Sequence, residues 1–187
     1  MEGKSIYKSF VSFCRMQEIE VKILEIDCQS VNQKLESLGA KKVFEGEVTA
    51  SYYDFSNGKL GKDGLVLRLR KKEQTVELTL KKKLSQAEAK IMQEYEVNVT
   101  NFEAMQNILY GLGLKEIKTA KKHRISYVLD DLHFDLDTYS GIPTFLEIEA
   151  PTLEKVREYV VKLGFSMKDT RPWSGGDLLW YYKKIKK

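Results

Sequence analysis

The chain has few cysteines, and this scarcity argues against two classes of small protein. Cys14 and Cys28 are its only two cysteines, and neither belongs to a CxxC motif or to a cluster with histidine. A disulfide framework or a structural zinc site needs more sulfur or imidazole ligands at closer spacing. This cysteine usage is typical of a reducing compartment, so we expect a cytoplasmic protein.

Long apolar runs are also missing, and proline is scarce. No apolar run approaches the roughly 18 to 20 residues that a membrane-spanning helix needs. The stretch from Phe10 to Cys14 is too short for the core of a signal peptide. With 3 prolines, 12 glycines and 42% hydrophobic residues, the 187-residue chain has the composition of one folded domain. No membrane partner is expected.

Charge of neither sign dominates, since the chain has 31 Lys and Arg residues and 27 Asp and Glu residues. Much of the small basic excess lies in short runs such as 81–83 and 183–187. Such runs are typical of a solvated surface. The net charge therefore gives no reason to expect nucleic acid as a partner.

Hydrophobic periodicity predicts a chain built mainly of strands. Alternating apolar and polar residues predict strands over 18–26, 41–55, 65–71, 76–83, 91–99, 114–129, 132–139 and 144–149. Apolar residues at spacings of three and four predict helices over 29–38, 101–110 and 153–163, and the segment from Ser174 to Asp177 can begin a last helix. The segment 56–64 is rich in turn residues and predicts a loop.

The strands share a pattern in which charged residues recur two positions apart. Residues two apart on a strand point to the same face. One face therefore carries Glu18, Glu20, Lys22, Arg68, Arg70, Thr79, Lys81, Lys83, Glu94, Glu96, Lys122, Arg124, Asp135, Asp137, Glu147 and Glu149. The other face carries Ile19, Val21, Leu69, Leu78, Leu80, Tyr95, Val97, Leu136 and Ile148.

The charged face has two interpretations. It can be the solvent side of an ordinary antiparallel sheet. Here, however, charge predominates and is largely grouped by sign on each strand, which suits binding of an anion together with its metal. If helices cover the apolar face, the charged face looks into a barrel. The expected fold is α+β, a closed eight-stranded antiparallel β-barrel with helices packed outside, whose buried charges need ligands as partners.

Several short motifs occur in a fixed order along the chain. Glu18-Ile19-Glu20-Val21-Lys22 has the form ExExK, and it is followed by Leu67-Arg68-Leu69-Arg70, Glu77-Leu78-Thr79-Leu80-Lys81, Gln93-Glu94-Tyr95-Glu96, Lys122-His123-Arg124, Asp137 before Gly141, and Phe145-Leu146-Glu147-Ile148-Glu149. This ordered set resembles the CYTH, or triphosphate tunnel metalloenzyme, superfamily. That superfamily includes class IV adenylyl cyclases and thiamine or inorganic triphosphatases.

The resemblance implies roles for the matched residues. It implies phosphate binding by Lys22, Arg68, Arg70, Lys81, Lys122 and Arg124, and binding of Mg²⁺ or Mn²⁺ by Glu18, Glu20, Asp137, Glu147 and Glu149. The implied catalytic set is Glu18, Glu20, Lys22, Arg70 and Lys81. Asp135 is less securely matched, Lys83, Glu94 and Glu96 are candidate supporting partners, and His123 faces away by strand parity. Because Met16 stands just before ExExK, residues 1–15 are expected to be a disordered extension of one domain at 16–187.

The resemblance leaves the reaction open between hydrolysis and cyclisation. The expected partner is a triphosphate-containing small molecule, namely tripolyphosphate, thiamine triphosphate or ATP. Class IV cyclases often have a His-Phe pair before ExExK, and this chain has Ser12-Phe13 instead. The favoured hypothesis is a triphosphatase. A class IV adenylyl cyclase and a non-catalytic polyphosphate-binding barrel are the alternatives, and a homodimer is left open.

Overall fold

The computed structural model describes residues 18–185, so the predicted N-terminal extension at 1–15 lies outside the described residues. The elements, in chain order, are β1 (Glu18–Ile23), α1 (Cys28–Ser37), β2 (Lys41–Phe55), α2 (Lys59–Lys62), β3 (Leu65–Lys72), β4 (Thr75–Gln86), β5 (Lys90–Val99), α3 (Phe102–Gly111), β6 (Leu114–Leu129), β7 (Leu132–Tyr139), β8 (Phe145–Ala150), α4 (Leu153–Lys162), the 3₁₀ turn η1 (Met167–Asp169), β9 (Thr170–Arg171) and α5 (Gly175–Ile185).

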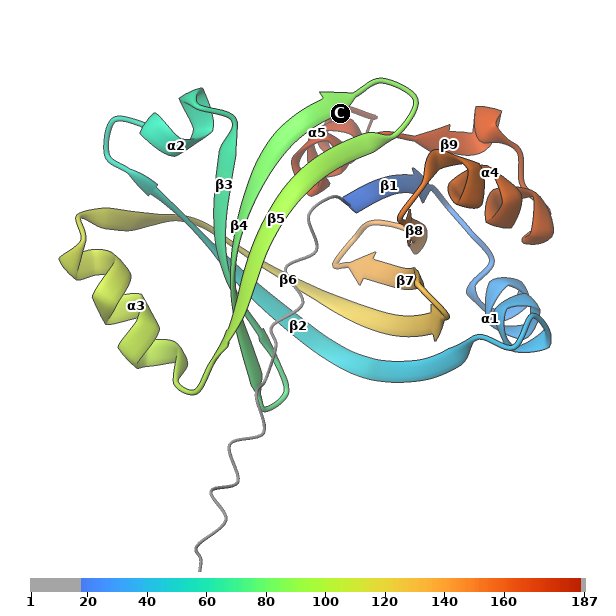
Figure 1. The fold of residues 1–187 in the computed structure, drawn as a ribbon, viewed down its shortest axis with the longest axis horizontal. Helices are drawn as coiled ribbons and strands as arrows, with labels where there is room; N and C mark the ends of the chain where they lie inside the picture. Colours follow the sequence, from blue (N-terminus) through green and yellow to red (C-terminus); the bar gives the residue numbers. More distant parts are fainter. Residues whose placement is uncertain (1–17, 186–187) are drawn as a thin grey trace, which may run out of the picture.

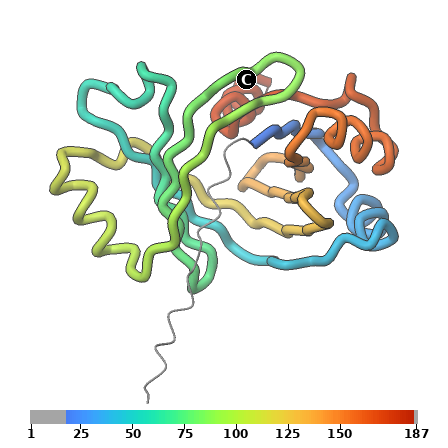
Figure 2. The backbone as a smooth tube through the Cα atoms, viewed as in Figure 1, coloured from blue at the N-terminus to red at the C-terminus, as the bar shows by residue number. Residues whose placement is uncertain are grey.

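Eight of these strands form a closed antiparallel barrel (Figure 1). The order around the barrel is β5-β4-β3-β2-β6-β7-β8-β1, and β1 pairs with β5 to close it, with Glu18 opposite Met92 and Glu20 opposite Lys90. The short β9 pairs with β1 as an addition to the barrel. Figure 2 shows the first described strand, in blue, lying among C-terminal segments in orange and red. The predicted eight-stranded barrel with outer helices is confirmed.

Helices cover the apolar outer face of the barrel on two sides (Figure 1). Val31 and Leu35 of α1 and Val156 and Val160 of α4 belong to one core cluster with the outward side chains of β1, β7 and β8, such as Ile148. On the other side, α3 packs through Leu109 against outward residues of β2, β3 and β4, including Tyr53, Leu69 and Val76. Burying these side chains on the outside leaves the charged positions to face inward.

The helices begin where side chains can accept hydrogen bonds from free backbone N–H groups. Asp27 accepts from the Gln29 amide at the start of α1, and Asn101 accepts from the Ala104 amide at the start of α3. Gly39 follows α1 with a positive φ of 86°, which a residue without a β-carbon adopts without strain. These local signals explain why the three long predicted helices appear within one residue of their expected limits.

Two local predictions are wrong. The segment 56–64 contains the single-turn helix α2, which the Asp54 carboxylate holds by accepting hydrogen bonds from the amides of Phe55, Leu60 and Gly61. The first strand ends at Ile23 and not at 26. Tyr95 and Val97 of β5 are on the outer face as predicted, where each is 49% exposed and belongs to neither of these two core clusters. Within the described residues, none of the helices is both long and apolar enough to cross a membrane.

Candidate active site

The barrel encloses a cavity of about 1150 Å³, which is called the lumen below. All eleven residues that the sequence assigns to the site line it, as do Asp135, Glu94 and Glu96. Lys83 does not line it and is exposed, although its position on β4 continues the alternation of Thr79 and Lys81. His123 alternates with Lys122 and Arg124 and is likewise absent from the lining. The eleven predicted site residues therefore line one cavity, as expected from the rule that residues two apart on a strand share a face.

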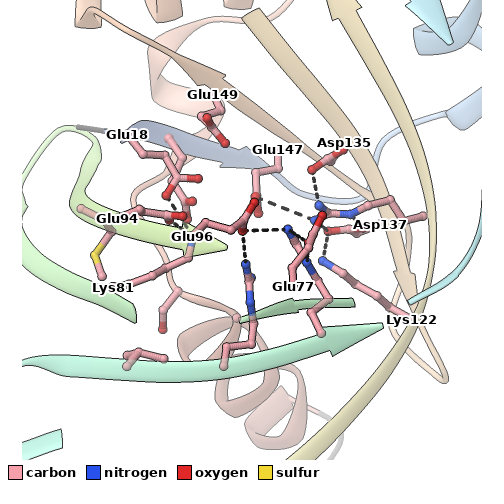
Figure 3. Close-up of a pocket in the computed structure, with 18 of the residues that line it drawn as sticks. Glu18, Glu77, Lys81, Glu94, Glu96, Lys122, Asp135, Asp137, Glu147 and Glu149 are labelled. Atoms are coloured by element: carbon pink, nitrogen blue, oxygen red, sulfur yellow. Dashed lines mark hydrogen bonds and ion pairs between the residues drawn. The ribbon is translucent and has the colours of Figure 1, made fainter. Parts of the chain in front are cut away.

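The charges are partly sorted between two walls of the lumen, although Lys22 of β1 and Lys90 of β5 lie on the wall that carries most of the carboxylates. Arg68 and Arg70 lie on β3, Lys122 and Arg124 lie on β6, and β2 runs between these two strands. The carboxylates come mainly from the other wall, where β7, β8, β1 and β5 carry Asp135, Asp137, Glu147, Glu149, Glu18, Glu20, Glu94 and Glu96. Figure 3 shows labelled side chains from both walls pointing into the same space.

Asp137 is fully buried and holds the two basic residues of β6. Its carboxylate accepts hydrogen bonds from Arg124 Nε at 2.7 Å, from Arg124 Nη2 at 2.6 Å and from Lys122 Nζ at 2.5 Å. Arg124 also pairs with Asp135. Burial alone would raise the pKa of Asp137, but Arg124 and Lys122 hold it below the ordinary value. In this structure, then, Asp137 fixes the direction of Lys122 and Arg124.

Glu147 connects strands on both sides of β8. Its carboxylate lies 2.6 Å from Lys22 Nζ and 3.9 Å from Arg124 Nη2. Lys22 also contacts Glu20 at 2.8 Å, and Lys90 contacts the same Glu20 oxygen at 2.8 Å. Burial alone would raise the pKa of Glu147, but its cationic neighbours hold it well below the usual range. The same carboxylates raise the pKa of buried Lys22 above its ordinary value, against the effect of burial.

A third set of contacts joins β3, β4 and β5. Arg70 Nε donates to Glu77 at 2.6 Å, and Lys72 Nζ lies 3.1 Å from the other Glu77 oxygen. Glu96 lies 3.4 Å from Arg70 and 3.7 Å from Arg68. Within residues 18–185, Arg68 Nε is buried and has no hydrogen-bond partner. One guanidinium N–H of the basic wall is therefore left for a ligand.

Sequence reasoning missed several charged residues that line the lumen, among them Lys72, Glu77 and Lys90. Lys72 shares the parity of Arg68 and Arg70, and Glu77 shares the parity of Thr79 and Lys81, so the signal for both was present. Lys90 precedes the predicted start of its strand. Only the structure shows that Lys90 faces the lumen, because it stands opposite Glu20 where β1 pairs with β5.

Two lysines of the lumen titrate at an unusually low pH. Burial is the main cause that lowers the pKa of Lys81 to about 8, with Arg68 adding repulsion, although Glu18 lies only 3.0 Å away and opposes the shift. Burial and the neighbouring Arg124 likewise lower the pKa of Lys122 to about 8, against the effect of Asp137. A polyanion bound beside them would favour their protonated forms.

The donor chemistry of the lumen fits a hard divalent cation. Asp and Glu outnumber Lys and Arg among the lining residues, so a triphosphate entering alone would meet an acidic excess. The inward carboxylates of β1 and β8 are neighbours, with Glu20 opposite Glu149 in register, and they offer the oxygen ligands that Mg²⁺ and Mn²⁺ prefer. Across residues 18–185, no three carboxylate, imidazole or thiolate groups already converge on a common point, because Lys and Arg side chains hold the carboxylates.

Comparison with known proteins gives a consistent result. The model of the CYTH domain matches residues 16–169. A protein of Methanocaldococcus jannaschii, named as a candidate adenylate cyclase, is 28% identical over 137 residues, which are 72% of this chain and 77% of that protein.

Two solved structures extend the likeness at the level of the fold. A candidate adenylate cyclase of Vibrio parahaemolyticus has a TM-score of 0.78 at 20% identity, over 88% of this chain and 98% of that chain. A Hippeastrum protein, described as a candidate adenylyl cyclase that reveals a dominant triphosphatase activity, has a TM-score of 0.60 at 14% identity, over 91% and 96% of the two chains. At such identities the likeness concerns the fold alone.

Proposed function

Because the chain belongs to the CYTH domain family, we propose that it is a metal-dependent enzyme that binds a triphosphate in the lumen and hydrolyses it. The observation that carries the proposal is the basic wall of β3 and β6, facing a wall of carboxylates in one cavity. Buried ions of both signs are costly unless each finds partners. A triphosphate with a bridging divalent cation supplies partners to both walls at once.

The basic residues of the lumen have distinct roles in this proposal. Arg68 offers its unpaired Nε–H to a phosphate oxygen, and Arg70 is held in place by Glu77. Lys122 and Arg124, fixed by Asp137, bind the phosphates from the β6 side. Because these cations are already oriented before the substrate enters, they can stabilise negative charge that develops during phosphoryl transfer without further rearrangement.

The carboxylates of β1 and β8 are the proposed metal ligands. The proposed ligands of Mg²⁺ or Mn²⁺ on these strands are Glu18, Glu20, Glu147 and Glu149. Asp137 of β7 is the fifth predicted ligand and the least exposed of them. When bound, the metal would neutralise phosphate charge and polarise the phosphoryl group. Lys22 and Lys90, which contact Glu20 here, would remain nearby as additional counter-charges for the phosphates.

A class IV adenylyl cyclase is the second candidate function. It is favoured by one observation, which is the name of the Methanocaldococcus jannaschii relative as a candidate adenylate cyclase. The two reactions differ in their nucleophile, since hydrolysis uses water at the terminal phosphorus and cyclisation uses the ribose 3′-hydroxyl at the α-phosphorus. Phosphate-binding residues serve either reaction equally, so the products must decide.

A product assay tests the proposal directly. The protein is incubated with tripolyphosphate, thiamine triphosphate or ATP in the presence of Mg²⁺ or Mn²⁺, and orthophosphate, pyrophosphate and cyclic AMP are resolved. We expect orthophosphate from at least one substrate, and we expect Arg70→Ala to lower kcat/KM by about a hundredfold because a charge-assisted phosphate contact is lost. Pyrophosphate together with cyclic AMP from ATP would identify a cyclase. Tight binding without any product would identify a non-catalytic barrel.

The low pKa values of Lys81 and Lys122 predict that triphosphate binding weakens as pH rises. Both lysines lose their protons as pH passes about 8, whereas the bound phosphates favour the charged forms. Binding above pH 8 must therefore take up protons, and affinity should fall by about tenfold per pH unit for each proton taken up. Calorimetric titration at pH 9 in two buffers of different ionisation enthalpy measures that uptake.

The matched control for this pH effect replaces both lysines by arginine, which stays charged throughout the range. The Lys81→Arg and Lys122→Arg double variant should bind tripolyphosphate with little proton uptake between pH 8 and pH 9. Equal proton uptake in the double variant and the wild type would assign the effect to other groups, the phosphates included.

A further inference from the structure

We propose that the Tyr139 hydroxyl is an additional ligand of the substrate, donating a hydrogen bond to the triphosphate from the wall of the lumen. The inference rests on the proposed function and deepens it, because it adds a neutral donor to the charged groups that the proposal assigns to the substrate. It arises from the position of this side chain in the lumen and from the hydrogen bonding of its hydroxyl.

Tyr139 lies on the inward face at the end of β7. It follows Asp137 by two residues, stands opposite Lys122 in the register with β6, and lines the lumen. Its ring stacks on Phe145 with centroids 6.1 Å apart and an interplanar angle of 13°, and Lys122 Nζ lies 5.8 Å from the ring centroid. These contacts hold the ring in place next to the basic residues of β6.

The hydroxyl of Tyr139 differs from those of the buried tyrosines. Tyr53 accepts a hydrogen bond from Gln106, Tyr127 donates to Glu36, and Tyr182 donates to Glu25. In the part of the chain that the structure describes, no hydrogen bond satisfies the Tyr139 hydroxyl. This hydroxyl is not one of the buried polar atoms that lack a partner in the described residues, so water reaches it, and a phosphate oxygen can take the place of that water.

The start of α5 lies beside this hydroxyl. A β-carbon on Gly175 would be 3.7 Å from the hydroxyl oxygen, and Ser174 to Gly176 line the same cavity. The hydroxyl therefore lies at the wall of the lumen, close to the start of α5.

The Tyr139→Phe variant tests this assignment, because it removes the hydroxyl and keeps the ring stacked between its neighbours. The dissociation constants of tripolyphosphate and ATP are measured by calorimetry with Mg²⁺ present, and kcat and KM are measured for every substrate that turns over. We expect binding of both ligands to weaken by about tenfold, with KM rising more than kcat falls. The thermal midpoint should stay the same, because the hydroxyl has no partner to lose.

Tyr182→Phe is the matched control, since its hydroxyl donates to Glu25 outside the lumen at 2.9 Å. This control should bind tripolyphosphate as the wild type does. A Tyr139→Phe variant with unchanged affinity would overturn the proposal, and so would one that weakens ATP but not tripolyphosphate, because the hydroxyl would then contact the organic group. Tight binding without turnover would contradict only the hydrolase function, whereas a wild type that binds neither ligand would contradict both.

Discussion

The Glu147→Gln variant is expected to lose metal-dependent turnover by about a thousandfold, which is the upper range for removing one preorganised electrostatic group from an active site. Glu147 lines the lumen between Lys22 and Arg124, and its pKa is held well below the usual range, so it is ionised at every pH where the protein would act. Glutamine has nearly the same shape but lacks the charge that a divalent cation requires.

The measurement is kcat for the best substrate over a series of Mg²⁺ concentrations, together with the dissociation constant of Mg²⁺ itself. Glu88→Gln provides the control, because Glu88 pairs with Arg157 on the exposed surface, outside the lumen. It should have wild-type activity. A Glu147→Gln protein that is folded and retains near-normal Mg²⁺-dependent turnover would contradict the assignment of Glu147 as a metal ligand.

The convergence of the charged residues could be predicted from the sequence because a strand has a fixed parity. Once Glu20, Arg70 and Lys81 were each placed on a strand, their charged neighbours two positions away had to share the same face. The barrel was predicted on the condition that helices cover the apolar face, since the charged face then has to look inward. Neither step needed knowledge of any tertiary contact.

The specific ion pairs could not be predicted in this way. Lys22 contacts Glu147, 125 positions along the chain from it, and the pair depends on how β1 and β8 align in register. Lys83 is likewise exposed and absent from the lining of the lumen, although its parity in the sequence predicted otherwise. The exposure of Tyr95 on the outer face of β5 also follows from no local pattern in the sequence.

The same geometry predicts that loss of Arg124 destabilises the fold. Asp137 is fully buried, and Arg124 supplies two of its three hydrogen bonds from cationic groups. In Arg124→Ala, this carboxylate keeps only Lys122, and Asp135 loses its arginine as well. Breaking a buried pair by removing one partner leaves uncompensated charge, so we expect the free energy of unfolding to fall by about 3 kcal/mol.

The pH dependence of that loss distinguishes an electrostatic cause from a cavity. In the wild type the pKa of Asp137 is lowered, so its contribution to stability is present above the ordinary carboxyl pKa and is lost as pH falls. Without Arg124, burial should raise the pKa of Asp137. The variant is then penalised at neutral pH and regains stability relative to the wild type as pH falls toward 5.

Urea denaturation of both proteins between pH 5 and pH 8 measures this difference. The Arg124→Ala and Asp137→Asn double variant should recover part of the lost stability at pH 8, because it no longer buries the unpaired charge. Arg157→Ala, which breaks an exposed pair with Glu88, should leave the denaturation midpoint unchanged. If Arg124→Ala were destabilised equally at pH 5 and pH 8, and Asp137→Asn did not relieve it, the loss would come from packing, and Asp137 would not depend on Arg124 for its charge.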